Sequence, residues 1–235
     1  MTFGALGDIH GDFASARRIM ERHADLPFWV CVGDLPDTAG TYEDVPRPLY
    51  WIKGNNEQFD LIDETPGLRA PAYENLHHIP NGTFVDIPTT DVGRGSQPRR
   101  LRVAGLGGTF APTWYETQAA QLPHPKKASA KATELADKRR HFVKEEVDAC
   151  SAMRNVDLLL THEAARPFRV GPMDAGKTPI NEVLAAMQPR LHLFGHHHRF
   201  SEQERQGVRS VGLDLVSKSY LLIDAETMKY HLQQT

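Results

Sequence analysis

The chain has 235 residues, of which 40% are apolar, so it is long enough to bury one sizeable hydrophobic core. Its 27 basic and 30 acidic residues give a formal net charge of −3, which excludes the global positive field of a non-specific nucleic-acid binder. The two cysteines, Cys31 and Cys150, lie in dissimilar settings and do not indicate a disulfide framework. No apolar run approaches the roughly 20 residues of a membrane span, and residues 2–6 do not resemble a secretory signal. We therefore expect a cytoplasmic protein that makes no contact with a membrane.

Apolar runs and helical spacings predict strands and helices that alternate along the chain. A strand at residues 2–6 is followed by a helix over residues 13–23, for which Asp12 is the expected N-terminal cap. A second crossover helix is predicted over residues 178–187. Further strands are predicted at residues 28–32, 49–52, 101–105, 156–160 and 190–194. This order predicts an α/β fold, which we expect to form a single domain over residues 1–235.

Two stretches depart from this alternation. The pair Asn81-Gly82 is a turn signal and predicts a β-hairpin that joins residues 77–79 to residues 84–86. A polar insertion at about residues 111–140 is rich in lysine and arginine toward its end. We expect it to begin a helix that continues to Cys150, and we expect its basic side chains to suit contact with a long polyanion.

Polar side chains follow five predicted strands at the points where those strands end. Because the carboxyl ends of strands in an open α/β sheet meet at a shared crevice, we expect these side chains to lie together. Each cluster alone is typical of an ordinary turn, but chance very seldom assembles all five in this order. The clusters are Gly7-Asp8-Ile9-His10, Gly33-Asp34, Gly54-Asn55-Asn56-Glu57, Thr161-His162 and Gly195-His196-His197-His198.

These clusters supply a set of candidate metal ligands. Asp8 and His10 flank one residue and can turn to the same side, and the Asp34 carboxylate has two oxygens that can bridge two ions. The full set is Asp8, His10, Asp34, Asn55, His162, His196 and His198. Carboxylate, amide and imidazole ligands suit manganese, iron, zinc or nickel better than calcium. Two divalent ions, two carboxylates and a bridging hydroxide leave a charge of about +1, which favours an anionic phosphoester.

The order of these motifs resembles that of the calcineurin-like metallophosphoesterases. Their pattern is Asp-x-His, Gly-Asp-x-x-Asp, Gly-Asn-His-Asp/Glu, a later histidine and Gly-His-x-His, and the match runs from residue 7 to residue 198. The resemblance implies a four-layer αββα sandwich of two mixed β-sheets flanked by helices. It also implies two divalent transition-metal ions, with manganese favoured, at loops on one edge.

Carried over residue by residue, the resemblance assigns roles to the motif positions. It places Asp8, His10, Asp34 and His198 on one ion, and Asp34, Asn55, His162 and His196 on the other. Asp8, Asp34, Asn56 and His162 become the catalytic residues. Asp37 and Glu57 match acidic positions whose side chains are expected to contact the metal ligands and not the ions themselves.

Asn56 is the main departure, because family members usually carry a histidine there as the candidate proton donor to the leaving oxygen. Asparagine cannot donate a proton, although it can hydrogen-bond a phosphoryl oxygen. We therefore predict a metal-dependent phosphodiesterase in which a metal-bridging hydroxide attacks a nucleotide-like or other small phosphodiester, with nucleic acid only as a possible substrate. One alternative is a phosphomonoesterase on nucleotides or phosphoproteins. Another is a catalytically weak regulatory module that binds metal or nucleotide.

Three further side chains follow the ligand motifs closely enough to be candidates for contact with substrate. Arg166 and Arg199 carry the positive charge that a phosphate group requires, although an exposed surface role is about as expected for each. His197 lies between two predicted ligands and could replace the missing proton donor. Together with Asn56, these residues form the predicted substrate-binding set.

Overall fold

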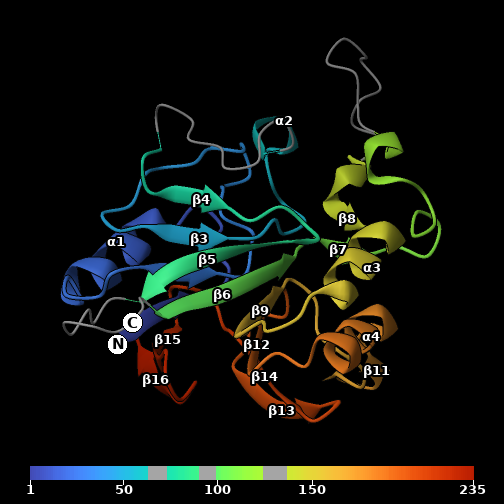
Figure 1. The fold of residues 1–235 in the computed structure, drawn as a ribbon. Helices are drawn as coiled ribbons and strands as arrows, with labels where there is room; N and C mark the ends of the chain where they lie inside the picture. Colours follow the sequence, from blue (N-terminus) through green and yellow to red (C-terminus); the bar gives the residue numbers. More distant parts are fainter. Residues whose placement is uncertain (63–72, 90–98, 124–136) are drawn as a thin grey trace.

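The computed structural model describes residues 1–62, 73–89, 99–123 and 137–235. Two mixed six-stranded sheets form its centre (Figure 1). The first sheet has the order β16-β15-β1-β2-β3-β4. Its strands are β1 (Thr2–Leu6), β2 (Trp29–Cys31), β3 (Leu49–Trp51), β4 (Leu76–His78), β15 (Ser219–Asp224) and β16 (Tyr230–Gln234). β1 to β4 are parallel, and β15 and β16 add antiparallel pairs.

The second sheet has the order β13-β14-β12-β9-β6-β5. Its strands are β5 (Thr83–Thr89), β6 (Arg99–Leu106), β9 (Leu158–Thr161), β12 (Leu191–Phe194), β13 (Ser201–Arg205) and β14 (Val208–Gly212). The four middle strands are parallel, and β5 and β13 pair antiparallel at the edges. The six strands predicted from apolar runs are thus confirmed. Such runs are continuous because the central strands of parallel sheets are buried on both faces.

Three apolar layers hold the sheets and helices together. One lies between the sheets and includes Val30 and Leu221 from the first sheet and Leu160 and Leu193 from the second. Helix α1 (Phe13–Arg22) covers the outer face of the first sheet. Helices α3 (Lys144–Ala152) and α4 (Thr178–Met187) cover the outer face of the second (Figure 1). The predicted four-layer αββα sandwich is confirmed.

Helix α1 illustrates how the sequence specifies these layers. Phe13, Ala16, Ile19 and Met20 recur at helical spacing and are all buried against the first sheet. The Asp12 side chain accepts a hydrogen bond from the backbone N–H of Ser15 at 3.1 Å, as the predicted cap requires. The chain thereby turns directly from the end of β1 into the covering helix.

The predicted hairpin at Asn81-Gly82 is wrong. β4 pairs with β3 in the first sheet, whereas β5 pairs with β6 in the second, so the turn crosses between sheets. The Asn81 side chain fixes this crossing, because it exchanges hydrogen bonds with the backbone of Gly107 at 2.6 and 3.0 Å. A turn signal alone does not determine which strand each neighbour pairs with.

The helix expected to begin in the polar insertion starts later than predicted. Residues 124–136 lie outside the described residues. After them come a short 3₁₀ turn at Lys138–Arg140, strand β8 (His141–Phe142) and only then α3. β8 pairs with β7 (Thr109–Phe110), so the end of the insertion is tied to the loop that follows β6.

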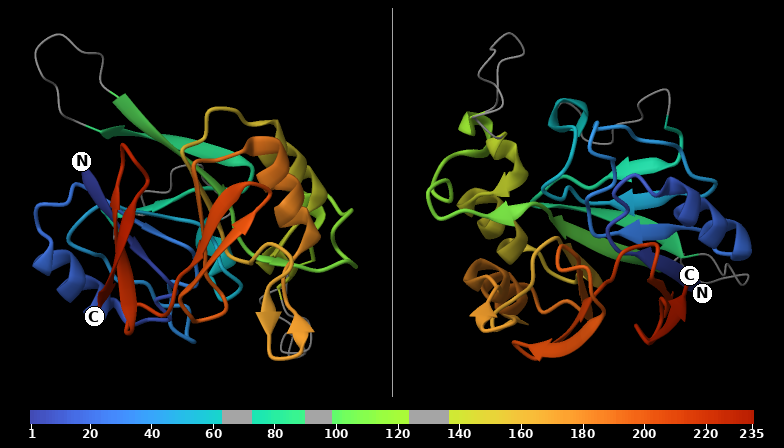
Figure 2. Two further views of the ribbon diagram at one scale, coloured as in Figure 1. Left: turned by 90° about the horizontal axis from the view of Figure 1, so that it is seen from below. Right: turned by 180° about the vertical axis from the view of Figure 1, so that it is seen from behind.

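The remaining short elements are helix α2 (Phe59–Ile62), a 3₁₀ turn at Ala119–Gln121, and the hairpin of β10 (Arg169–Val170) and β11 (Met173–Asp174), which projects from the sandwich (Figure 2). Cys31 and Cys150 are both buried and unpaired, as predicted. Within the ranges given above, no helix has the length and apolar character of a membrane span.

Candidate metal centre and its cavity

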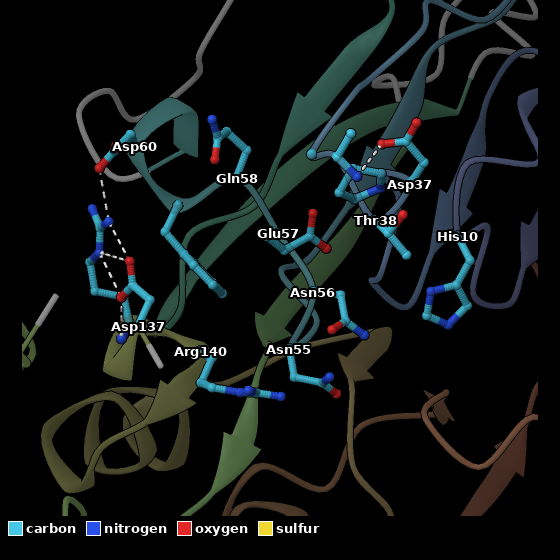
Figure 3. A pocket seen from close by; sticks show the side chains of 15 residues that line it. His10, Asp37, Thr38, Asn55, Asn56, Glu57, Gln58, Asp60, Asp137 and Arg140 are labelled. Carbon is cyan, nitrogen blue, oxygen red and sulfur yellow. Dashed lines mark hydrogen bonds and ion pairs between the residues drawn. The ribbon is translucent and has the colours of Figure 1, made fainter. Parts of the chain in front are cut away.

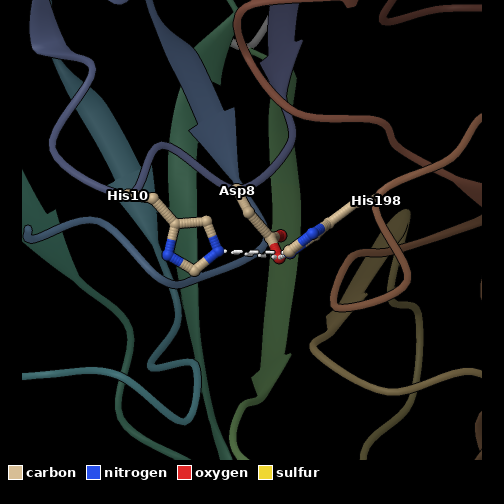
Figure 4. A group of neighbouring side chains, drawn as sticks. All are labelled: Asp8, His10 and His198. Carbon is tan, nitrogen blue, oxygen red and sulfur yellow. Dashed lines mark hydrogen bonds and ion pairs between the residues drawn. The ribbon is translucent and has the colours of Figure 1, made fainter. Parts of the chain in front are cut away.

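Asp8, His10 and His198 form a first group of donor side chains on the loops that follow β1 and β12 (Figure 4). Nε2 of His198 lies 3.1 Å from Oδ2 of Asp8 and 3.1 Å from Nε2 of His10. Atoms that share one transition-metal ion, each at about 2.1 Å from it, lie roughly 3 Å apart. The three side chains therefore have the spacing of ligands to a single cation.

Asp8, Asp34 and His162 form a second group, whose donor atoms all lie within 4.8 Å of one another. Nε2 of His162 is 3.5 Å from Oδ2 of Asp34 and 3.1 Å from Oδ1 of Asn55. The same Asp34 oxygen lies 3.6 Å from Nε2 of His10. Asp34 thus has a histidine of each group beside the same oxygen, where a carboxylate could bind two ions at once.

The two carboxylates of this centre are buried, and their ion-pair partners are histidines. Asp8 and Asp34 are each 1% exposed, and in the described part of the chain neither pairs with lysine or arginine. Burial opposes the negative charge of Asp34, but His162 and the Asn56 backbone hold its pKa below the ordinary value. Two buried, ionised carboxylates are unfavourable unless positive charge compensates them. The donor set therefore fits divalent cations in both chemistry and charge.

A backbone contact orients His162. Its side chain is fully buried, and Nδ1 lies 2.8 Å from the carbonyl oxygen of Val32, which directs Nε2 toward Asp34. Burial opposes a positive charge on this ring, but the Asp34 carboxylate raises the pKa of His162 to about 10. A cation at Nε2 requires the neutral imidazole, so metal binding here would release a proton.

Four residues of the centre have positive φ, an uncommon conformation outside glycine. The angles are 47° at His10, 51° at Asp34, 68° at His196 and 47° at His198. Such conformations cost on the order of 1–3 kcal/mol each and tend to cluster at functional sites. Here they turn the chain sharply where β1, β2 and β12 end, and this brings the candidate ligands together.

Two glycines allow the backbone to approach the carboxylates closely. A Cβ atom on Gly54 would lie 2.0 Å from Oδ1 of Asp34, and one on Gly195 would lie 2.3 Å from Oδ1 of Asp8. Both distances are far below van der Waals contact. A larger residue at either position would displace a carboxylate of the centre.

Asn56 and Glu57 connect the loop after β3 to the centre. The Asn56 backbone N–H donates to Oδ1 of Asp34 at 2.8 Å, and its side-chain amide donates to Oδ2 at 2.9 Å. Glu57 is buried and accepts hydrogen bonds from the Tyr42 hydroxyl at 2.6 Å and the Gly54 N–H at 2.9 Å. Burial raises the pKa of Glu57 to about 8, against the opposing effect of the Tyr42 hydrogen bond. The Tyr42 contact is not foreseeable from the sequence, because Tyr42 lies in a loop without a motif.

His196 contacts the centre chiefly through its backbone, whose N–H donates to the Asp8 carboxylate at 3.0 and 3.3 Å. Its ring lies 4.9 Å from that of His162, and Nε2 is 4.0 Å from Oε1 of buried Glu163. Burial lowers the pKa of His196 to about 3, so the ring is neutral, as a metal ligand must be. Its nitrogen is in neither group above, and its role as a ligand stays a prediction.

A cavity of about 840 Å³, lined by both polar and apolar groups, opens beside the centre (Figure 3). The candidate ligands His10 and Asn55 line it together with Asn56, and Asp137 lies at the opposite side in this view. The 3₁₀ turn at the end of the insertion forms part of the wall through Arg139 and Arg140. The cavity thus connects the candidate metal centre with the described end of the insertion.

Asp37 also lines this cavity and is exposed. Its Oδ1 accepts hydrogen bonds from the backbone N–H groups of Thr41 and Ala39 at 2.9 Å each, and these bonds hold its pKa below the ordinary value. Asp37 therefore stabilises a turn in the cavity wall, and its predicted support of the ligands stays a prediction.

The other predicted substrate contacts lie apart from the cavity. Arg166 is half exposed and pairs with Asp174 at 2.9 Å. The Arg199 guanidinium lies 4.6 Å from the centre of the Phe168 ring, and the His197 ring stacks on Phe168 with 4.4 Å between centroids. Burial lowers the pKa of His197 to about 4. None of the three lines the cavity described above, and their contact with substrate stays a prediction.

Comparison with known proteins agrees with this architecture. The chain is similar over 99% of its length to TT1561 of Thermus thermophilus, with a TM-score of 0.63, 14% identity and 98% of that chain covered. It is also similar to the calcineurin-like phosphoesterase YfkN of Bacillus subtilis, with a TM-score of 0.56, 11% identity, and coverage of 100% of this chain and 90% of that one. A dimetal phosphatase of Danio rerio matches with a TM-score of 0.52, 11% identity, and coverage of 100% and 98%.

At these identities the solved structures show the fold alone, and no curated protein matches the chain. The family model for calcineurin-like phosphoesterases matches residues 1–200, which contain all the clusters of the candidate metal centre. Members of this family bind divalent metal ions and hydrolyse phosphoesters. The chain belongs to the calcineurin-like phosphoesterase family.

Proposed function

We propose that the protein is a phosphodiesterase that uses two divalent metal ions, with manganese favoured over iron, zinc or nickel. The preference for diesters rests on the position of Asn56 in the candidate metal centre. Its amide donates to Asp34 within the candidate metal centre, where the family usually has a histidine. An amide cannot supply a proton to a poor leaving group such as an alkoxide. This favours diesters and activated leaving groups over unactivated monoesters.

We assign Asp8, His10, Asp34 and His198 to one ion and Asp34, Asn55, His162 and His196 to the other. The contacts of Asp34 with both His10 and His162 support this assignment. Bound ions would supply a water of lowered pKa and neutralise negative charge on the phosphoryl oxygens. The protein's own part is to hold that centre rigidly, since the Val32 carbonyl orients His162 and Asn56 binds both oxygens of Asp34.

The size of the neighbouring cavity supports a diester substrate. A phosphodiester carries a second organic substituent, which needs room next to the phosphorus. The cavity of about 840 Å³ begins at His10 and Asn56, beside the candidate ligands, and lies within the size range of small-molecule sites. Its walls present both polar and apolar groups, which suits a substituent that combines a ring with hydroxyl groups, such as a nucleoside.

The test is hydrolysis of bis-p-nitrophenyl phosphate and p-nitrophenyl phosphate by metal-stripped protein, with and without added manganese. Asp34→Asn serves as the blank, because it removes one carboxylate of the centre at nearly constant volume. We expect manganese-dependent cleavage of the diester that is at least about a hundredfold slower in the variant. Faster turnover of the monoester would favour a phosphomonoesterase. Manganese binding without turnover of either compound would favour a regulatory binding module.

A further inference from the structure

Arg140 lies where it can contact a substrate in the cavity. It ends the 3₁₀ turn Lys138–Arg140, and its side chain extends along the cavity toward Asn55 (Figure 3). Arg140 is partly exposed, so its guanidinium can be reached from the cavity. A planar guanidinium is the side-chain group best suited to hold a phosphate, because it can donate two parallel hydrogen bonds.

The backbone on both sides of Arg140 is fixed by the buried ammonium group of Lys53. Lys53 is 6% exposed, and its Nζ donates to the carbonyl oxygens of Arg139 at 2.8 Å and of His141 at 3.4 Å. Lys53 directly precedes Gly54 and Asn55, so this contact ties the position of Arg140 to a loop of the metal centre. The signal in the sequence is a lysine at the end of the apolar run 49–52.

A second set of contacts holds the same segment from the other side. β8 pairs with β7 through Thr109 and His141, and Oγ1 of Thr109 lies 2.9 Å from Nδ1 of His141. The Gly108 N–H donates to the carbonyl oxygen of Lys53 at 2.7 Å. Arg140 is therefore attached to a fixed backbone, which reduces the entropy lost when its side chain binds a ligand.

The charged neighbours of Arg140 are already engaged with other protein groups. Arg139 forms ion pairs with Asp137 at 2.6 Å and with Asp60 at 2.8 Å. Asp37 binds backbone N–H groups of its own turn, and Glu57 is buried against Tyr42. Among the residues that the structure describes, no acidic side chain pairs with Arg140. Its positive charge is thus available to an anion in the cavity.

We propose that Arg140 is a substrate-binding residue that holds a non-bridging oxygen of the phosphodiester, while the cavity between Arg140 and His10 takes a polar, nucleoside-sized substituent. This inference rests on the proposed function for its substrate class. It gives the basic end of the insertion a specific role, because Arg140 supplies a cation to the phosphate from the side of Asn55. The competing interpretation is a solvated surface arginine, which predicts no effect on the binding of anions.

The experiment compares wild type, Arg140→Met and Arg140→Lys in the manganese-loaded protein, with Arg154→Met as the matched control. Arg154 is an exposed arginine that donates to the carbonyl oxygens of Ser151 and Met153 at the end of α3. Steady-state kinetics use bis-p-nitrophenyl phosphate and thymidine 5′-(p-nitrophenyl phosphate). Calorimetric titration with inorganic phosphate measures anion binding without turnover, and metal content is determined for each variant.

We expect Arg140→Met to lower kcat/KM for both diesters by about 10- to 1000-fold and to weaken phosphate binding at least about tenfold, with unchanged manganese content. Arg140→Lys should restore part of both, because lysine keeps the charge but loses the paired donors. Unchanged phosphate binding in Arg140→Met would overturn the inference. If wild type cleaves neither diester, the proposed function fails, and phosphate titration still decides the role of Arg140.

Discussion

The side-chain amide of Asn56 donates to Oδ2 of Asp34 at 2.9 Å, and this oxygen is the one that lies between His10 and His162. The amide therefore lies next to the atom that we expect both metal ions to share. At this position a protonated imidazole could give its proton to a departing oxygen, whereas an amide can only donate a hydrogen bond. The chemical range of the enzyme is expected to depend on this one side chain.

Replacement of Asn56 by histidine should therefore change which substrates are cleaved. General acid catalysis contributes about 10²–10⁴-fold, mostly for poor leaving groups. We expect Asn56→His to raise kcat for alkyl phosphates by at least about tenfold and to change kcat for p-nitrophenyl diesters little. Asn56→Ala, which also removes the amide but adds no acid, is the control. Equal gains in both variants would mean that loss of the bond to Asp34, and not proton donation, is responsible.

Gly54 gives a test of how closely the loops around Asp34 are packed. A Cβ at this position would lie 2.0 Å from Oδ1 of Asp34, so Gly54→Ala should displace that carboxylate. We expect manganese affinity and diester hydrolysis to fall at least about tenfold. Gly171→Ala is the matched control, because its φ is +57° but a Cβ there has no neighbour within 4 Å. Metal titration of both variants would contradict the packing argument if they lost affinity equally.

Burial of His192 in the second sheet should make the free energy of unfolding depend on pH. It is fully buried, with Nε2 2.7 Å from Oγ1 of Thr161 and Nδ1 2.9 Å from Oγ of Ser210, and burial lowers its pKa to about 3. Between pH 6.5 and 3 the unfolded chain binds a proton that the native protein does not. The free energy of unfolding must therefore fall as pH falls, by up to about 1.4 kcal/mol per pH unit for this group.

Urea unfolding of metal-stripped protein at pH 7.0 and 5.5 checks this sign. From pH 7.0 to 5.5, wild type should lose about 1 kcal/mol more stability than His192→Gln, since glutamine keeps polar contacts but does not titrate. His231→Gln, which changes an exposed histidine on β16, should show the same loss as wild type. An identical pH dependence in all three proteins would exclude His192 as the source.

The fold could largely be predicted from the sequence, because its signals are local and strong. Apolar runs such as residues 28–32 and 156–160 belong to parallel strands that are buried on both faces, and the cap at Asp12 fixes the start of α1. The hairpin predicted at Asn81-Gly82 is wrong because the strand partner on each side depends on contacts distant in the sequence. Asn81 holds Gly107, which no local pattern indicates.

The grouping of Asp8 and His10 with His198 could also be predicted, but from the order of the motifs along the chain, because β1 and β12 belong to different sheets. The groups around the centre could not be predicted from the sequence. Tyr42 and Lys53 act through contacts with Glu57 and with the carbonyl of Arg139, which only the folded chain brings together. In the sequence Arg140 is one basic residue among several. Only the folded chain distinguishes it from Arg139, which pairs with Asp60 and Asp137.

Lys53 provides the last prediction, because its effect on substrate binding should act through Arg140. Lys53→Met removes the two hydrogen bonds that hold the carbonyls of Arg139 and His141, so the segment between them loses its anchor. We expect phosphate binding to weaken about as much as in Arg140→Met. A double-mutant cycle measures whether the two changes are coupled. The double variant should bind phosphate no more than about threefold more weakly than Arg140→Met alone. If the losses in phosphate binding are fully additive, or if Lys53→Met loses manganese, Lys53 acts instead through Gly54 and the metal centre.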